Sequence, residues 1–131
     1  RIAIVPEVGR ARMSGGANYP AEGVQFEAIA YAKGSGSRKA PDVALGPVPA
    51  TFRLTELKTR PGDDDMTWLG TILPHGSYLP TVDYAPNPKR TYTGENSGLV
   101  KVLARYKRGG RTYDAQAELV VTVPDYIARI R

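Results

Sequence analysis

Apolar and polar residues alternate along most of the chain, which is the pattern of β-strands with one buried face. In residues 24–33, for example, Val24, Phe26 and Ala28 fall on one face while Gln25 and Glu27 fall on the other. The alternating segments are short and are bounded by Gly, Pro and other turn residues. We expect strands at residues 24–33, 43–45, 50–55, 66–73, 77–80, 99–106 and 113–123.

The clearest local prediction is a β-hairpin in the last third of the chain. Gly109 and Gly110 separate two long alternating segments, and a Gly-Gly pair supplies the positive φ angles that a tight hairpin turn requires. A register shift of one residue would break both the apolar and the ionic matches across the hairpin. The predicted opposite pairs are Val100 with Leu119, Val102 with Ala117, Ala104 with Ala115, Tyr106 with Tyr113, Lys101 with Glu118 and Arg105 with Asp114.

The segment around Gly46 predicts either an edge strand or a change of sheet. It contains Pro47 and Pro49, and proline lacks the N–H that a central strand must donate. The apolar faces of the expected strands point to a common core, which we expect to centre on Trp68, Phe26, Phe52, Val102, Ala104 and Leu119.

Many short strands with Pro/Gly turns and no helical periodicity indicate an all-β fold. We predict one domain, residues 1–131, folded as an immunoglobulin-like antiparallel β-sandwich. A small β-barrel is the alternative that the pattern leaves open.

Composition narrows the possible functions. The chain has 131 residues, no cysteine and a net charge of +5. Without cysteine, thiol catalysis, thiolate metal sites and c-type haem attachment are excluded. The positive charge is spread evenly along the chain, which argues against nucleic-acid binding, and no apolar run approaches the ~20 residues of a membrane span. The start of the chain, where Pro6 interrupts the first apolar residues, does not resemble a signal peptide, although a processed chain would look the same.

Few residues suggest chemistry. The one histidine, His75, lies in a Pro-His-Gly turn and has no candidate nucleophile or metal partner. The acidic run at residues 63–65 lacks the spacing of a dedicated calcium loop and is better explained as a solvated loop. We therefore expect no catalytic residue, no cofactor site and no metal site in this chain.

Residues 81–98 predict a long irregular connection, which is uncommon in a compact domain and is often functional. It carries Tyr84, Lys89, Arg90 and Tyr92, and tyrosine with arginine is typical of protein interfaces. We expect these four residues to form part of an interface with another domain or subunit. Tyr78, which lies beside a loop, is open to the same interpretation or to packing over the end of the sandwich.

An ordered series of short stretches resembles one known family, the C-terminal β-domain of the α subunit of quinohemoprotein amine dehydrogenases. The stretches that carry the resemblance are residues 25–28, 42–51 and 70–72, Gly76-x-Tyr78-x-Pro80, residues 86–90, Asn96-x-Gly98-x-Val100-x-Val102, and residues 119–124. The family tends to have an acidic loop where this chain has residues 34–41, so a cation site in that loop does not transfer.

The resemblance implies a periplasmic assembly that oxidises primary amines with a tryptophylquinone and two c-type haems, both carried outside the domain matched here. On this reading the chain is a non-catalytic structural or interaction domain, with other domains or subunits as partners. A free-standing extracytoplasmic immunoglobulin-like module that binds a protein or glycan is the alternative.

Overall fold

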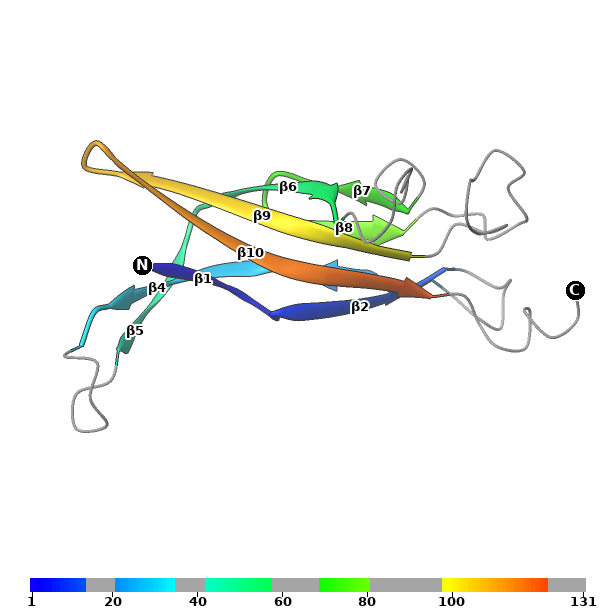
Figure 1. Ribbon diagram of the computed structural model, residues 1–131, viewed down its shortest axis with the longest axis horizontal. Helices are drawn as coiled ribbons and strands as arrows, with labels where there is room; N and C mark the ends of the chain where they lie inside the picture. The colour runs from blue at the N-terminus through cyan, green and yellow to red at the C-terminus, as the bar shows by residue number, and fades with distance from the viewer. Residues whose placement is uncertain (14–20, 35–41, 58–68, 81–97, 123–131) are drawn as a thin grey trace, which may run out of the picture.

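The computed structural model describes residues 1–13, 21–34, 42–57, 69–80 and 98–122, and this part of the chain is folded into β-strands without a helix (Figure 1). The strands are β1 (Ile2–Val5), β2 (Val8–Arg12), β3 (Val24–Gln25), β4 (Glu27–Ala32), β5 (Val43–Val48), β6 (Thr51–Glu56), β7 (Gly70–Ile72), β8 (Ser77–Pro80), β9 (Gly98–Arg108) and β10 (Arg111–Thr122).

The predicted hairpin is confirmed, and its two strands are the longest in the described part of the chain. β9 and β10 pair antiparallel in the expected register, with Val102 opposite Ala117 and Arg105 opposite Asp114. Gly109 and Gly110 have φ angles of 59° and 76°, as a tight turn between right-twisted strands requires. This hairpin forms the centre of a four-stranded sheet with the order β2-β10-β9-β6.

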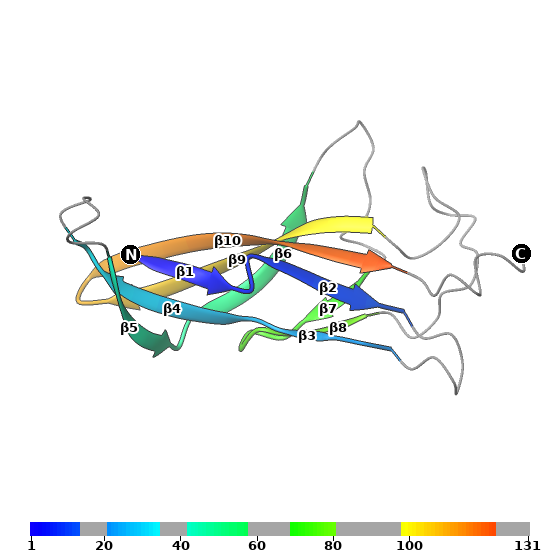
Figure 2. The ribbon, with the colours of Figure 1, turned by 90° about the horizontal axis from the view of Figure 1, so that it is seen from below.

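The remaining strands form the second layer of a sandwich. They pair as two three-stranded sheets, β1-β4-β5 and β3-β8-β7. β3 and β4 are consecutive, separated by Phe26 alone, and run end to end along this layer, so they link the two sheets (Figure 2). The fold is therefore the all-β, immunoglobulin-like sandwich that the alternation predicts.

One strand pair is parallel, which the alternation does not reveal. β1 pairs antiparallel with β4, the chain then passes through Pro6 and Glu7, and β2 joins the opposite sheet beside β10. β2 runs parallel to β10, whereas the other strand pairs of the described residues are antiparallel. The change of layer after β1 lets one short N-terminal segment cover an edge of both layers.

The proline-containing segment also changes layer, as predicted. β5 is an edge strand that pairs with β4, and β6 is an edge strand of the opposite sheet that pairs with β9. Pro49 and Ala50 connect them. Edge positions tolerate Pro47 because an edge strand leaves half of its N–H groups without a partner strand.

Both layers contribute to one hydrophobic core. Phe26, Phe52, Val102, Ala104 and Leu119 are buried, as the sequence predicts. The sixth expected core residue, Trp68, lies outside the described residues. The core also contains apolar side chains from segments that the pattern did not assign to strands: Ile2, Ile4, Ala11 and Met13.

A tight turn after β7 joins the two layers. The backbone N–H of Phe52 donates to the carbonyl of Pro74 at 2.9 Å, and that of Phe26 donates to the carbonyl of Gly76 at 2.8 Å. Because Phe52 and Phe26 belong to opposite layers, this turn fixes the separation of the two layers on one side of the core. His75 lies in the turn with its side chain exposed, as the sequence predicts.

Candidate interaction surface

The outer face of the four-stranded sheet carries polar side chains from the neighbouring strands β6, β9 and β10. Strand alternation sends Phe52 and Leu54 of β6 into the core and leaves Thr51 and Arg53 outside. On β9 the same alternation leaves Leu103, Arg105 and Lys107 on the outer face. The register brings these two sets together, since Thr51 pairs with Arg105 and Arg53 pairs with Leu103.

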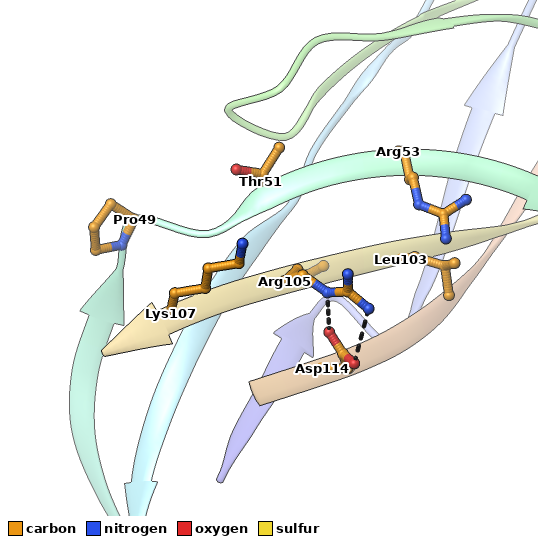
Figure 3. Close-up of a pocket in the computed structure, with 9 residues that line it drawn as sticks. Pro49, Thr51, Arg53, Leu103, Arg105, Lys107 and Asp114 are labelled. Atoms are coloured by element: carbon orange, nitrogen blue, oxygen red, sulfur yellow. Dashed lines mark hydrogen bonds and ion pairs between the residues drawn. The ribbon is translucent and has the colours of Figure 1, made fainter. Parts of the chain in front are cut away.

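A shallow groove with a volume of about 580 Å³ lies on this face (Figure 3). Pro49 bounds one end and Leu103 contributes apolar surface, while Asp114 reaches the groove from β10. Lys107 extends over the groove toward Thr51, and the Arg53 guanidinium lies above Leu103 (Figure 3). Three cations and one carboxylate therefore surround a partly apolar surface.

The groove contains one ion pair with two hydrogen bonds. Arg105 Nε donates to Asp114 Oδ1 at 2.8 Å, and Arg105 Nη2 donates to Asp114 Oδ2 at 3.3 Å. The hydrogen bond from Arg105 lowers the pKa of Asp114, and its positive charge and that of Arg53 act in the same direction. The same hydrogen bond raises the pKa of Arg105. Both carboxylate oxygens are thus occupied by one guanidinium.

The other two cations of the groove have no such partner. Within the part of the chain that the structure describes, neither Arg53 nor Lys107 forms an ion pair. Both side chains are exposed. The groove therefore carries a local excess of positive charge that its own residues leave uncompensated.

A second exposed surface lies on β5, and it is apolar. Val43 and Leu45 are 60% and 66% exposed, large values for aliphatic side chains in a strand. In the described residues β5 has one strand partner, β4, and Figure 1 shows it diverging from the body of the sandwich. Neither face of β5 is fully covered by the rest of the domain.

The base of β5 is tied to β1 by a small polar cluster. Arg1 Nε donates to Asp42 Oδ2 at 2.7 Å, and the Gly34 N–H donates to Asp42 Oδ1 at 2.9 Å. The Gly34 hydrogen bond and then the Arg1 hydrogen bond lower the pKa of Asp42. The Arg1 guanidinium also lies 4.4 Å from the centre of the Tyr31 ring. These contacts hold the β4–β5 pair at a defined place on the domain.

The structure offers no constellation for catalysis or metal binding within its described residues. No group of three or more His, Cys, Asp or Glu side chains in that part could hold a metal ion. His75 contributes its carbonyl to a 3.3 Å hydrogen bond from Gln25, which is a structural use of the turn. The acidic residues 63–65 lie outside the described ranges, so the predicted absence of sites remains a prediction.

The predicted interface residues cannot be compared with this surface. Tyr84, Lys89, Arg90 and Tyr92 all lie outside the described residues. Tyr78 is described, and the interpretation that it lies in an interface is wrong. It belongs to β8 and is fully buried, and its hydroxyl donates to the Leu69 carbonyl at 2.5 Å. Burial raises the pKa of this phenol.

Sequence reasoning missed Arg53, Val43 and Leu45. Arg53 could have been found, since the alternation of residues 50–55 places it opposite Phe52 and Leu54. The exposure of Val43 and Leu45 had no signal in the sequence, because aliphatic residues in a strand normally face a core. Only the three-dimensional arrangement shows that β5 diverges from the body of the sandwich (Figure 1).

Comparison with known protein families identifies the chain. Residues 2–129 match the family described as quinohemoprotein amine dehydrogenase, alpha subunit domain IV. The chain belongs to this family. The match covers nearly the whole sequence and confirms the resemblance carried by the short stretches from Gln25 to Pro124. No curated protein matches the chain.

As domain IV of an α subunit, the chain is an accessory domain of an amine dehydrogenase subunit, and its family setting includes other domains of that subunit. The described residues contain no helix long and apolar enough to cross a membrane.

Proposed function

We propose that this chain is a non-catalytic structural and interaction domain of a periplasmic quinohemoprotein amine dehydrogenase. The observation that carries the proposal is the family match across residues 2–129. Amine oxidation belongs to the whole assembly, and this domain carries neither the quinone nor a haem.

The titratable groups support a non-catalytic role. Asp42 and Asp114 have lowered pKa values. Asp42 is partly exposed and accepts hydrogen bonds from the Gly34 N–H and Arg1, and Asp114 is exposed and accepts hydrogen bonds from Arg105, as in ordinary surface ion pairs. A general acid or base needs a pKa near the working pH and a place beside the substrate. Among the described groups, the one with a strongly raised pKa is Tyr78, whose hydroxyl is buried in the core.

The exposed apolar side chains of β5 support the interaction role. Leaving aliphatic side chains in water is unfavourable by ~25 cal/mol per Å² relative to burying them, and exposed apolar patches commonly mark contact sites. Val43 and Leu45 lie on a strand that has one strand partner, β4, among the described residues, so a neighbour can cover them. We assign this surface to contact with another domain or subunit of the dehydrogenase.

The proposal is tested by substitutions that are expected to change association with the rest of the α subunit and not the fold of the domain. Leu45→Asp should weaken association of this domain with the remaining α-subunit chain at least about tenfold, measured by size-exclusion chromatography of the mixed purified parts. Leu79→Asp is the matched control, because Leu79 is also an exposed leucine on a strand, at 55% exposure, but belongs to β8 in another sheet. Equal effects of the two substitutions would contradict the assignment of β5.

The non-catalytic role has its own test. The purified 131-residue chain should show no visible absorption and no amine-dependent reduction of a dye. Either signal from the pure chain would overturn the proposal.

A further inference from the structure

We propose that the groove between β6 and β9 binds an acidic, extended segment of a neighbouring polypeptide. This inference rests on the proposed interaction role and deepens it by naming the chemistry of one partner. The ligand class is a peptide that presents carboxylates, and the residues that select it are Arg53 and Lys107.

The first step of the argument is the charge of the groove. Its lining contributes three cations and the single carboxylate of Asp114. Arg105 occupies both oxygens of that carboxylate. Arg53 and Lys107 remain without a carboxylate in the described part of the chain, so two positive charges face the same concave surface (Figure 3). A ligand with two negative charges complements them.

The second step is geometric. Arg53 is opposite Leu103 in the β6–β9 register, and Leu103 and Lys107 are four residues apart on β9. The two cations that lack a carboxylate are therefore offset by four residues, ~13 Å, along the strands. Carboxylates four positions apart in an extended peptide have the same spacing. An extended segment with acidic residues at its first and fifth positions, lying along the groove antiparallel to β9, matches Lys107 and then Arg53.

The third step is the shape and rigidity of the groove. Pro49 forms one wall where the chain changes layer, and Thr51 supplies a hydroxyl beside the Lys107 side chain (Figure 3). Phe52, between Thr51 and Arg53, is held by its backbone hydrogen bond to Pro74. The surface is thus presented by strands of the sandwich and costs little conformational entropy to order on binding.

A competing explanation assigns Arg53 and Lys107 to protection of the sheet edge. Charged residues on edge strands discourage pairing with other molecules, and β6 is an edge strand. Under that explanation the cations prevent self-association and bind no peptide. The experiment below separates the two explanations.

The test uses the folded 131-residue chain and a synthetic peptide of sequence Asp-Thr-Thr-Thr-Asp with blocked ends. Titration is followed by two-dimensional amide NMR at low salt, with the asparagine analogue Asn-Thr-Thr-Thr-Asn as the uncharged control. We expect saturable shifts confined to the amides of β6, β9 and the start of β10, and at least tenfold weaker binding of the control. Added salt should lower the affinity for the acidic peptide and leave the affinity for the control peptide unchanged.

Variants assign the binding to the groove. Arg53→Gln and Lys107→Gln should each lower the affinity for the acidic peptide at least threefold, and the double variant should lower it about tenfold. Arg10→Gln is the matched control because it removes the same charge from an exposed arginine on the outer face of β2, which is separated from β6 by two strands. Unchanged amide dispersion in each variant verifies the fold.

Four outcomes overturn the inference. The first two are an equal loss of peptide affinity in Arg10→Gln and amide shifts that lie outside the groove. The third is tighter binding of a single-stranded oligonucleotide than of the peptide. The fourth is self-association of the groove variants while the unchanged chain binds no peptide. The association test of Leu45→Asp is independent of this groove, so failure of the peptide to bind leaves the proposed function standing.

Discussion

Arg105 on β9 and Asp114 on β10 face each other across the hairpin and are joined by hydrogen bonds of 2.8 and 3.3 Å. The pair lies on the outer face, while the next pair along, Ala104 and Ala115, lies on the inner face. One register therefore satisfies an ionic match outside and an apolar match inside. A shift by one residue would place Arg105 against the core.

The lowered pKa of Asp114 predicts how this pair responds to pH. Because the folded-state pKa lies below its ordinary value of 3.8, the carboxylate contributes stability above that value, and the contribution is lost as pH falls through the folded pKa. The difference in urea midpoint between the unchanged chain and Asp114→Asn should thus be small but measurable at pH 7 and should vanish in strong acid. The pair is exposed and screened, so added salt should reduce the difference.

Arg105→Gln provides the control for this experiment. If the ion pair is the cause, the double variant with Asp114→Asn should have the same pH dependence as Arg105→Gln alone. A difference that persists below the folded pKa would mean that Asp114 acts through another contact.

The buried tyrosine makes a second prediction. Tyr78→Phe removes the hydroxyl that donates to Leu69 and leaves that carbonyl without its donor in a fully buried setting. We expect a loss of about 1–3 kcal/mol in the free energy of unfolding. Tyr113→Phe is the control, since its hydroxyl makes no hydrogen bond within the described residues, and it should change stability little. Urea unfolding measures both, and equal losses would contradict the role of the buried hydrogen bond.

The hairpin could be predicted from the sequence because all of its information is local. The Gly-Gly turn fixes the loop length, and the alternation on both sides then fixes the register. β1 and β2 could not be predicted in the same way. They are only four and five residues long and are separated by Pro6 and Glu7, so neither gives a full alternating window, and their partners lie far along the chain.

Tyr78 and Leu79 show a different limit of sequence reasoning. Both are large and apolar enough to be buried. β8 has only four residues, which is too few for the alternation to show which face points to the core. The structure buries Tyr78 completely and leaves Leu79 55% exposed. Inside the core the Tyr78 hydroxyl has a hydrogen-bond partner in Leu69, nine residues away, and no periodicity reveals that partner.

The candidate site could also be predicted only in part from the sequence. The pairing of Arg105 with Asp114 follows from the hairpin register alone. The approach of Arg53 depends on β6 pairing with β9, a contact between segments about fifty residues apart in sequence. Such long-range pairing is determined by the packing of the whole core, so the groove became visible only in three dimensions.

The assignment of inner and outer faces makes a third prediction. Val102→Asp places an unpaired charge at a fully buried position and should cost several kcal/mol in the free energy of unfolding. Val120→Asp is the matched control, because it makes the same substitution on the half-buried outer face of β10. Denaturant unfolding should show a large loss for the first variant and a much smaller one for the second. An unchanged midpoint for Val102→Asp would refute the face assignment.

The turn that joins the two layers makes the last prediction, for which Gly76 is the decisive residue. Its φ angle is +100°, a conformation that other residues rarely adopt, and a Cβ at this position would lie 2.3 Å from the carbonyl oxygen of Phe26. That oxygen belongs to the backbone between β3 and β4, so it cannot move without disturbing both strands.

Gly110→Ala separates the steric contribution from the backbone contribution. Gly110 also has a positive φ, +76°, but nothing lies within 4 Å of a Cβ there. We expect Gly110→Ala to cost about 1–2 kcal/mol in the free energy of unfolding through its φ angle alone, and Gly76→Ala to cost clearly more because the turn must also move away from Phe26. Urea unfolding of the two variants measures the difference, and amide NMR should show shifts around Phe26 and Phe52 only for Gly76→Ala. Equal costs would mean that the turn has room to relax and does not fix the separation of the layers.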